Sequence, residues 1–263
     1  MIIARVFSAL VMVSILACAS APETEQTRVA PQPARPSVLD GMMRELAPRS
    51  GTPRFLGVSP RMHNRDDEED RAILHVAEQA SRYIRMAARY QLVTQREGRS
   101  IGFLENIDAA WDEQLADQLV ESVTVLRTHR DDQGTFVLAS VSGLPTVPVL
   151  VPDAGRTTGE PEWISRPPEI PGFLVTVGVS RRSHRLRDSL DTADQEALKE
   201  ILLEARSTVR LMEERVDVDR VGTLQTIRAA QNAEALLRQF LVLSRYASSD
   251  GRYYYSLVIA REE

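Results

Sequence analysis

The sequence predicts an α+β protein built from two duplicated βααββ modules, each with helices packed on a small antiparallel sheet. Three observations lead to this fold class. All fourteen prolines lie in residues 22–60 or 145–171, which leaves two long proline-free stretches, and proline is excluded from helix interiors and central strands. A short motif opens both stretches. A strand-turn-strand pattern closes both.

The opening motif is the first sign of a repeat. Residues 57–63 and 178–184 share five identities in seven, at a separation of 121 residues. The positions behind the motif repeat at the same separation and follow one helical face. In the first copy they are Val76, Ala77, Ala80, Ile84, Ala87 and Ala88, and in the second Ala197, Leu198, Ile201, Ala205, Thr208 and Val209.

The closing strands give a third match. Residues 124–126 match 241–243 at a separation of 117, ahead of a glycine in each copy. Three collinear matches with one small deletion indicate an internal duplication. The two copies should then superpose, with Gly57 over Gly178 and Gly134 over Gly251.

Each copy reads as the same order of elements. A short strand leads into a long amphipathic helix, a second helix follows, and two strands joined by a turn close the module. Thr192 with Gln195 predicts the start of the second long helix. The expected ranges are 54–59 and 173–180 for the strand, 67–91 and 192–216 for the long helix, and 104–119 and 223–238 for the second helix.

The N-terminus predicts export and lipidation. The apolar run over residues 6–17 is about as long as a signal-peptide core and too short to span a bilayer, which needs about 20 residues. It ends in residues 15–18, which resemble the lipobox of bacterial lipoproteins. Cys18 is the single cysteine of the chain and stands where acylation requires it. An ordinary secretory signal is the alternative, because small residues surround the same position.

These features divide the chain into five parts. Ala19 and Ser20 follow the cysteine, a pattern that favours sorting to the outer membrane, with the body in the periplasm or at the surface. The predicted parts are a lipoprotein signal peptide at 1–17, a lipidated tether at 18–52, a first module at 53–141, a proline-rich connection at 142–171 and a second module at 172–263.

Composition and motifs point away from catalysis. A net charge of −5 gives no electrostatic reason to expect nucleic acid. The four histidines have no metal-type spacing, and no catalytic or nucleotide-binding signature is present. We therefore expect no enzyme, no catalytic residue, no metal and no cofactor.

The duplicated motif holds the one candidate polar site. Arg61 and His63 in the first copy, with Arg182 and His184 in the second, could form paired loops that bind an anion or a partner beside a helix start. The alternative is that these residues only solvate a strand-to-helix connection.

The motifs together resemble the twenty-kilodalton outer-membrane lipoprotein family. The residues that carry the resemblance are the lipobox, the strand that ends in Gly-Val-Ser, the Pro-x-Trp opening at 161–163 and the aromatic strand at 253–258. The resemblance covers 161–260 and, more weakly, 53–141. It implies a lipid-anchored surface or periplasmic protein, with members linked to motility-associated envelope structures, and it brings no enzymatic activity.

Two functions are compatible with these features. The first is a non-catalytic structural or assembly role, in which acyl chains on Cys18 (palmitate among them) hold the protein to the membrane and the body pairs with itself or with another envelope protein. The alternative is a ligand-binding or regulatory lipoprotein that contacts cell-wall synthesis or another envelope machine. The size of the protein in solution discriminates between them, since oligomers favour the first and a monomer the second.

Overall fold

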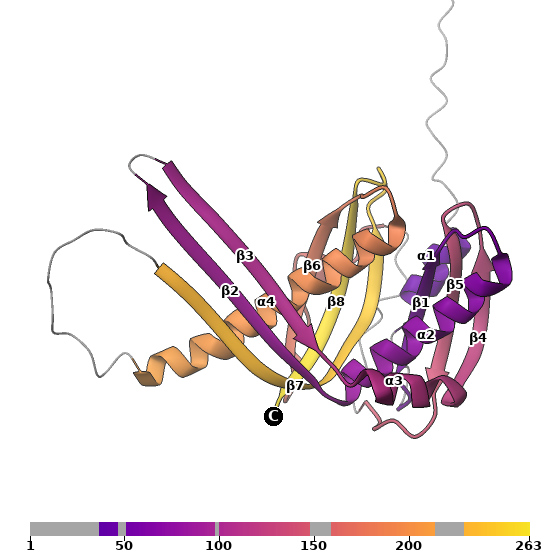
Figure 1. Ribbon diagram of the computed structural model, residues 1–263, viewed down its shortest axis with the longest axis horizontal. Helices are drawn as coiled ribbons and strands as arrows, with labels where there is room; N and C mark the ends of the chain where they lie inside the picture. The colour runs from indigo at the N-terminus through magenta and orange to yellow at the C-terminus, as the bar shows by residue number, and fades with distance from the viewer. Residues whose placement is uncertain (1–36, 47–50, 98–99, 148–158, 214–228) are drawn as a thin grey trace, which may run out of the picture. The chain divides into compact units, whose positions relative to one another are not determined.

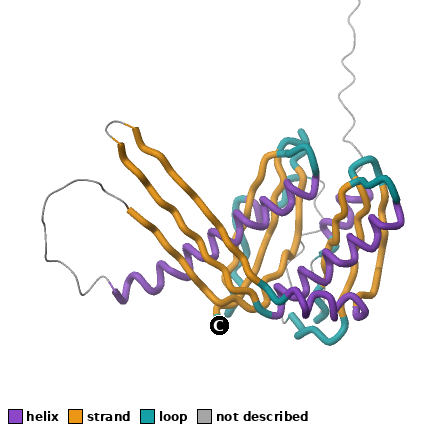
Figure 2. The backbone as a smooth tube through the Cα atoms, in the orientation of Figure 1, coloured by secondary structure: helices purple, strands orange, loops and turns teal. Residues whose placement is uncertain are grey.

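The protein has an α+β fold, as the sequence predicts. The computed structural model describes residues 37–46, 51–97, 100–147, 159–213 and 229–263 (Figure 1). Within these residues, four α-helices and two 3₁₀ turns accompany eight strands in two antiparallel sheets (Figure 2). The helices are α1 (Val38–Arg44), α2 (Arg65–Ile84), α3 (Glu113–Leu119) and α4 (Leu186–Glu213), and the strands are β1 (Arg54–Pro60), β2 (Met86–Glu97), β3 (Ser100–Ala110), β4 (Val123–Arg130), β5 (Gly134–Val141), β6 (Leu174–Arg181), β7 (Ala229–Ala247) and β8 (Tyr253–Glu262).

The first sheet has the strand order β1-β5-β4 and is buried on both faces of β1 and β5. Alternate residues of a strand point to opposite faces. Phe55 accordingly joins a buried cluster with Val76 and Tyr83 of α2, whereas Leu56 joins a second cluster with Met42 of α1. The sheet therefore lies between α2 and α1.

The second sheet has the order β3-β2-β7-β8-β6, with α4 packed on it. The β2–β3 hairpin comes from the first half of the chain, between α2 and α3, and joins this sheet where β2 pairs with the start of β7 (Figure 1). Residues 86–110 therefore lie within the predicted first module but belong to the second sheet.

Without the β2–β3 hairpin and α3, the two halves have the same topology. We call β1, α2, β4 and β5 the first unit, and β6, α4, β7 and β8 the second unit. The sheet order is β1-β5-β4 in one and β6-β8-β7 in the other. In both, the helix lies so close to the first strand that only glycine fits. A Cβ on Gly57 would lie 1.9 Å from the carbonyl oxygen of Ala72, and one on Gly178 would lie 1.8 Å from that of Ala193.

The strand registers agree with this equivalence. In each unit, the strand farthest from the first strand in the sheet has a β-bulge. The bulges lie at Leu126 in β4 and at Leu243 in β7, a separation of 117 residues. Gly57 pairs with Val137 and Gly178 with Ser256, so the last strands correspond at a separation of 119 residues. The predicted equivalence of Gly57 and Gly178 thus agrees with the registers.

The predicted equivalence of Gly134 and Gly251 is wrong. Gly134 pairs with Pro60, and the residue paired with the equivalent Arg181 is Tyr253. Gly251 lies in the turn before β8. The second hairpin has a longer connection than the first, so the matching glycines do not occupy matching positions. A duplicated origin stays a prediction.

The βααββ order also needs correction. α2 ends at Ile84 and residues 86–97 form β2, so the predicted helix over 67–91 is too long. Of the predicted second helices, residues 113–119 are helical, but 104–110 and 229–238 are strands, and 223–228 lie outside the described residues. Thr192 is inside α4, where its hydroxyl donates to the Asp188 carbonyl at 2.7 Å, and does not cap it.

The reason for the strand at β2 is its pattern of burial. Met86, Ala88 and Tyr90 are buried, whereas Ala87 and Arg89 are exposed. This alternation is the period of a strand, and pairing with β7 on one side and β3 on the other stabilises it. In the part of the chain that the structure describes, no helix is both long and apolar enough to cross a membrane.

Candidate functional site

The predicted Arg/His loops occupy equivalent places in the two units. Arg61 and His63 lie between β1 and α2, and Arg182 and His184 lie between β6 and α4, all four being exposed. Each loop leads from the first strand of its sheet into the helix that covers that sheet. The structure therefore places these residues at corresponding strand-to-helix connections.

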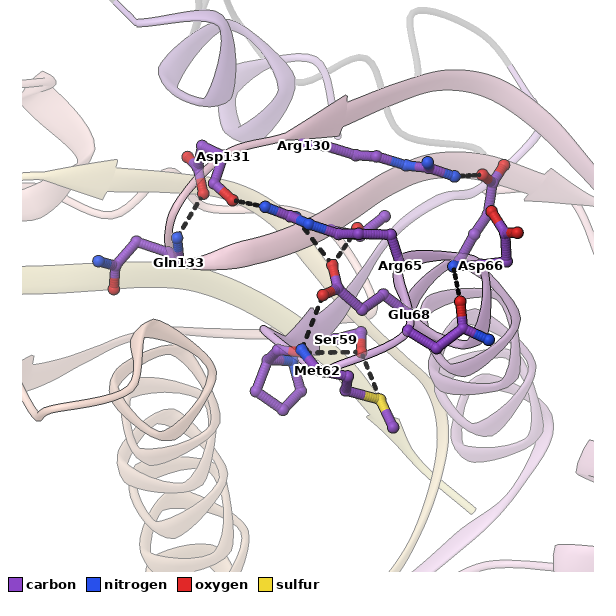
Figure 3. Close-up of polar contacts among 12 residues, drawn as sticks. Ser59, Met62, Arg65, Asp66, Glu68, Arg130, Asp131 and Gln133 are labelled. Atoms are coloured by element: carbon purple, nitrogen blue, oxygen red, sulfur yellow. Dashed lines mark hydrogen bonds and ion pairs between the residues drawn. The ribbon is translucent and has the colours of Figure 1, made fainter.

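In the first unit, Glu68 holds the loop in place. Its side chain is fully buried, and its carboxylate accepts hydrogen bonds from the Met62 amide at 2.7 Å, from the Thr135 hydroxyl at 2.7 Å and from Arg65 at 3.0 Å (Figure 3). Burial alone raises the pKa of the Glu68 carboxyl. The hydrogen bonds and the charge of Arg65 outweigh burial, so the pKa is below its ordinary value.

The second unit uses a serine at the equivalent position. The buried Ser189 hydroxyl accepts a hydrogen bond from the Ser183 amide at 2.8 Å, and the Ser180 hydroxyl donates to the Ser189 carbonyl at 2.5 Å. Ser183 and Ser189 correspond to Met62 and Glu68 at the separation of 121 residues. Glu68 and Ser189 therefore both hold the loop amide in place, one through a carboxylate and the other through a hydroxyl.

The two loops do not form one site. They follow strands of different sheets, and among the described residues no hydrogen bond or ion pair joins one loop to the other. Each loop offers exposed cationic side chains to solvent, an arrangement that can attract an anion but does not enclose one. Joint anion binding by the paired loops stays a hypothesis.

A second polar cluster lies where the two units meet, and we call this region the junction. Across it, His75 Nε2 of α2 lies 3.8 Å from Asp191 Oδ1 of α4. Arg187 of α4 lies 3.9 Å from the Glu78 carboxylate. The side-chain amide of Gln239, in β7, donates to the Tyr83 hydroxyl at 3.2 Å. Helices and strands of both units therefore share a network of polar contacts.

Helix α2 also covers the edge of β1 that has no strand neighbour. The Val58 amide donates to His75 Nδ1 at 3.1 Å, and the Gln79 side chain donates to the Leu56 carbonyl at 2.9 Å. These bonds satisfy backbone groups that no neighbouring strand pairs. The bond from the Val58 amide also fixes the tautomer of His75, because an accepting Nδ1 leaves the proton on Nε2, toward Asp191.

The junction perturbs the titration of its groups. Burial, with the positive charges of Arg187, Arg82 and Arg245, holds the pKa of His75 well below its ordinary value. Burial and the nearby charge of Asp194 raise the pKa of Asp191, although its arginine neighbours act in the opposite direction. The histidine is therefore neutral at neutral pH.

A second buried charge, after Glu68, is Arg245 of β7, whose side chain is 1% exposed. It forms an ion pair with Asp194 of α4. Arg245 Nε and Nη1, and the second oxygen of Asp194, find no hydrogen-bond partner among the described residues. The pair is thus buried but only partly satisfied.

A cavity of about 320 Å³ lies beside this cluster. Three carboxylates, one guanidinium and several apolar side chains form its wall, and Arg82 lies over the Trp111 ring at 3.7 Å. A wall of this composition can hold a small polar molecule. Its residues are Arg82, Met86, Ile107, Asp108, Ala109, Trp111, Asp191, Asp194, Gln195, Leu198 and Phe240.

The sequence did not single out this cluster. Its members are far apart in the chain and come from α2, α4 and β7. One available signal was His75, which stands next to Val76 on the long helix of the first predicted copy. The equivalent position in the second copy is Glu196, so the histidine is not part of the repeated pattern. Cys18 lies outside the described residues, and within those residues no group of three or more possible metal ligands occurs.

No protein-family model matches the chain, and neither a curated protein nor a solved structure matches it. The fold and the junction define an α+β protein with two βαββ units joined by a buried polar contact. The resemblance to the twenty-kilodalton outer-membrane lipoprotein family stays a prediction.

We expect stability to fall as the pH falls below about 6.5, the ordinary pKa of histidine. Because the folded pKa of His75 is depressed, the unfolded chain binds the proton first, and acid therefore favours unfolding. The slope that one such group contributes is at most about 1.4 kcal/mol per pH unit. Urea unfolding between pH 7.5 and 5, in steps of about half a unit, measures it.

The variant His75→Asn tests the assignment, since its side-chain oxygen can accept from Val58 but does not titrate. Its slope over this range should be shallower than that of the wild type. His63→Asn, at an exposed histidine, is the control and should keep the wild-type slope. Equal slopes for His75→Asn and the wild type would show that another group causes the pH dependence.

Proposed function

We propose that the protein is a lipid-anchored protein of the bacterial envelope with a non-catalytic structural or assembly role. One observation carries the anchoring: the single cysteine of the chain, Cys18, closes an apolar run in a lipobox-like sequence. Acyl chains on that cysteine would attach the body to the outer membrane, in the periplasm or at the surface. Of the predicted tether at 18–52, residues 38–44 form the helix α1, which packs into the body, and residues 18–36 lie outside the described residues.

The architecture supports association as the role of the body. Four strands lie at sheet ends, β1 and β4 in one sheet and β3 and β6 in the other. An end strand has one side without a strand neighbour, and such sides are common sites of protein association. Side chains of α2 cover that side of β1. A partner could therefore dock at one of the other ends.

A ligand-binding or regulatory role is the second candidate, and the cavity at Arg82, Asp191 and Asp194 favours it. The two roles predict different sizes for the protein. Self-assembly predicts mass that grows with concentration, and a regulator predicts a monomer.

We predict that Cys18→Ser releases the protein from membranes. The acyl chains are the proposed anchor, and each buried methylene contributes about 0.8 kcal/mol to membrane attachment. Fractionation of cells that produce the wild type or the variant measures the membrane-bound share. The wild type should sediment with membranes, and the variant should not.

Ser20→Ala is a suitable control, since it changes a neighbouring residue and keeps the cysteine. It should fractionate as the wild type does. Cys18→Ser protein that still sediments after a high-salt wash would contradict the lipid anchor.

A further inference from the structure

Large exposed apolar side chains gather on two strands at sheet ends. Among the described residues, four such side chains are exposed, and three of them lie on β4 or β6. They are Val125 (39% exposed) and Leu126 (48%) on β4, and Val179 (45%) on β6. The fourth, Val38, lies on α1. The exposed apolar side chains therefore lie on β4 of the first unit and on β6 of the second.

The equivalents of these three residues are buried in the other unit. Val179 of β6 corresponds to Val58 of β1, which is 2% exposed. Val125 and Leu126 of β4 correspond to Val242 and Leu243 of β7, which are 8% and 0% exposed. Leu126 and Leu243 are both bulge residues, so this correspondence rests on register as well as on sequence.

The junction and the neighbouring helix α1 together account for this difference, because Val58 lies on the face of the first sheet that α1 covers, and α1 and α2 both pack against β7. Val58 and Val242 belong to one buried cluster, and a small cavity is lined by Phe55 of β1, Gln79 of α2 and Val242 of β7, among others. Helix α2 of the first unit therefore lies against β7 of the second, together with α1, and Phe55 of β1 reaches the cavity beside Val242.

The side of β7 that meets the first unit has no strand on it. β2 pairs with β7 only between residues 229 and 237. α1 and α2 pack against β7, and beyond residue 237 the Gln239 side chain donates to Tyr83 of α2 and Arg44 of α1 lies over the Tyr246 ring. The β1 end of the first unit, with α1 and α2 over it, thus faces β7 of the second unit through side chains and without a backbone ladder.

This contact is head-to-tail, because it joins the β1 end of the first unit to the β7 side of the second. The opposite end of each unit is therefore left open. The first unit uses its β1 end, so its β4 end is open, and the second unit uses its β7 side, so its β6 end is open. The open β4 end is equivalent to β7, and the open β6 end is equivalent to β1. A contact of this kind can repeat between molecules, giving a closed ring or an open filament.

We propose that the β6 end of one molecule binds the β4 end of a second copy of the chain, in the manner of the junction. The inference names the partner for the assembly role proposed above and rests on that role. Val179 of one copy packs against Val125 and Leu126 of the next. No backbone pairing is required, because the junction itself uses side chains.

The charges of the two ends suit this arrangement. The helix positions that cover β1 are His75 and Gln79, and the equivalent positions on α4 are Glu196 and Glu200. β4 carries Arg127 and Arg130, which form ion pairs at the surface with Glu45, at the end of α1, and with Glu69 of α2. Exposed pairs contribute little stability, so these arginines can exchange partners at low cost. Carboxylates on α4 beside the β6 end, of which Glu196 also lies 3.6 Å from Lys199, would therefore face a strand with two arginines.

Two single variants test the proposal. The full chain is extracted from cells in mild detergent and its mass is measured by sedimentation at increasing concentration. The wild type should form oligomers. Leu126→Arg blocks every β4 end and Val179→Arg blocks every β6 end, so each protein alone should be monomeric. An equal mixture of the two should form a dimer and nothing larger, because each mixed pair has one intact contact.

Val38→Arg is the matched control, since Val38 is also an exposed apolar residue (53% exposed) but lies on α1. It should assemble as the wild type does. Unchanged circular dichroism and thermal unfolding would show that all three variants are folded.

Several outcomes overturn the proposal. A monomeric wild type excludes self-association. Oligomers that survive Val179→Arg but not Leu126→Arg indicate β4 pairing with β4. A monomeric mixture shows that the two ends do not bind each other. Membrane attachment is measured separately with Cys18→Ser, so a failure here with the anchor intact contradicts this inference alone.

Discussion

Asp194→Ala is expected to destabilise the protein by about 3–5 kcal/mol, the usual cost of leaving one charge of a buried pair without its partner. Asp194 is the ion-pair partner of Arg245, whose side chain is 1% exposed and has two further nitrogens without partners among the described residues. Removing the carboxylate leaves a buried guanidinium without its ion-pair partner, with only the longer-range charge of Asp191 nearby. Urea unfolding at neutral pH measures the change in the free energy of unfolding.

Two comparisons separate this mechanism from a general loss of packing. The double variant Asp194→Leu with Arg245→Met removes both charges and should be much more stable than Asp194→Ala, since apolar replacement of a whole buried pair is often neutral or stabilising. Glu234→Ala breaks the exposed pair with Arg89 and should cost at most about 1 kcal/mol. If Asp194→Ala cost no more than Glu234→Ala, the buried pair would contribute nothing measurable.

A buried pair of this kind suits a junction that must form in one arrangement. An apolar contact alone is tolerant of sliding, whereas Arg245 is neutralised only when α4 brings Asp194 to it. His75 adds a second condition, because its Nδ1 and Nε2 face different partners. The polar groups therefore favour a single register between the units at some cost in stability.

The sequence predicted the parts of the fold that local pattern determines. The strand with Gly57, the helix behind it and the closing hairpin follow from short-range periodicity and turn residues, and the same holds for the second unit. The strands at 86–97, 100–110 and 229–247 were missed in whole or in part. Alanine-rich segments of this kind suit a helix equally well, and the pairing of β2 with β7, far away in the sequence, decides the outcome.

The same distinction between local pattern and long-range contact separates the two candidate sites. The Arg/His loops were found because a repeated motif is visible in one dimension. The junction was missed because His75, Asp191 and Arg245 belong to separate segments and gain their meaning only from being buried together. The bulge at Leu126 was also invisible, although the sequence match of 124–126 with 241–243 already contained the residues that form the exposed β4 end and its buried equivalent.

Gly178→Ala is expected to destabilise the protein by about 3 kcal/mol or more, at the upper end of the cost of overpacking. A Cβ there would lie 1.8 Å from the Ala193 carbonyl oxygen and 2.5 Å from the Ala197 nitrogen. Both are backbone atoms of α4, so no side chain can rotate away, and the helix must move off β6. Gly57→Ala should have a similar effect, because its Cβ would lie 1.9 Å from the Ala72 carbonyl oxygen.

Gly41→Ala provides the control for this prediction. Gly41 lies in α1, and a Cβ there would meet nothing within 4 Å. Alanine is the better helix former by about 0.5–1 kcal/mol, so this variant should be slightly more stable than the wild type. Thermal unfolding of the three proteins therefore compares one chemical change in opposite environments. If Gly178→Ala unfolded at the wild-type temperature, α4 could not lie as close to β6 as the equivalence of the two units requires.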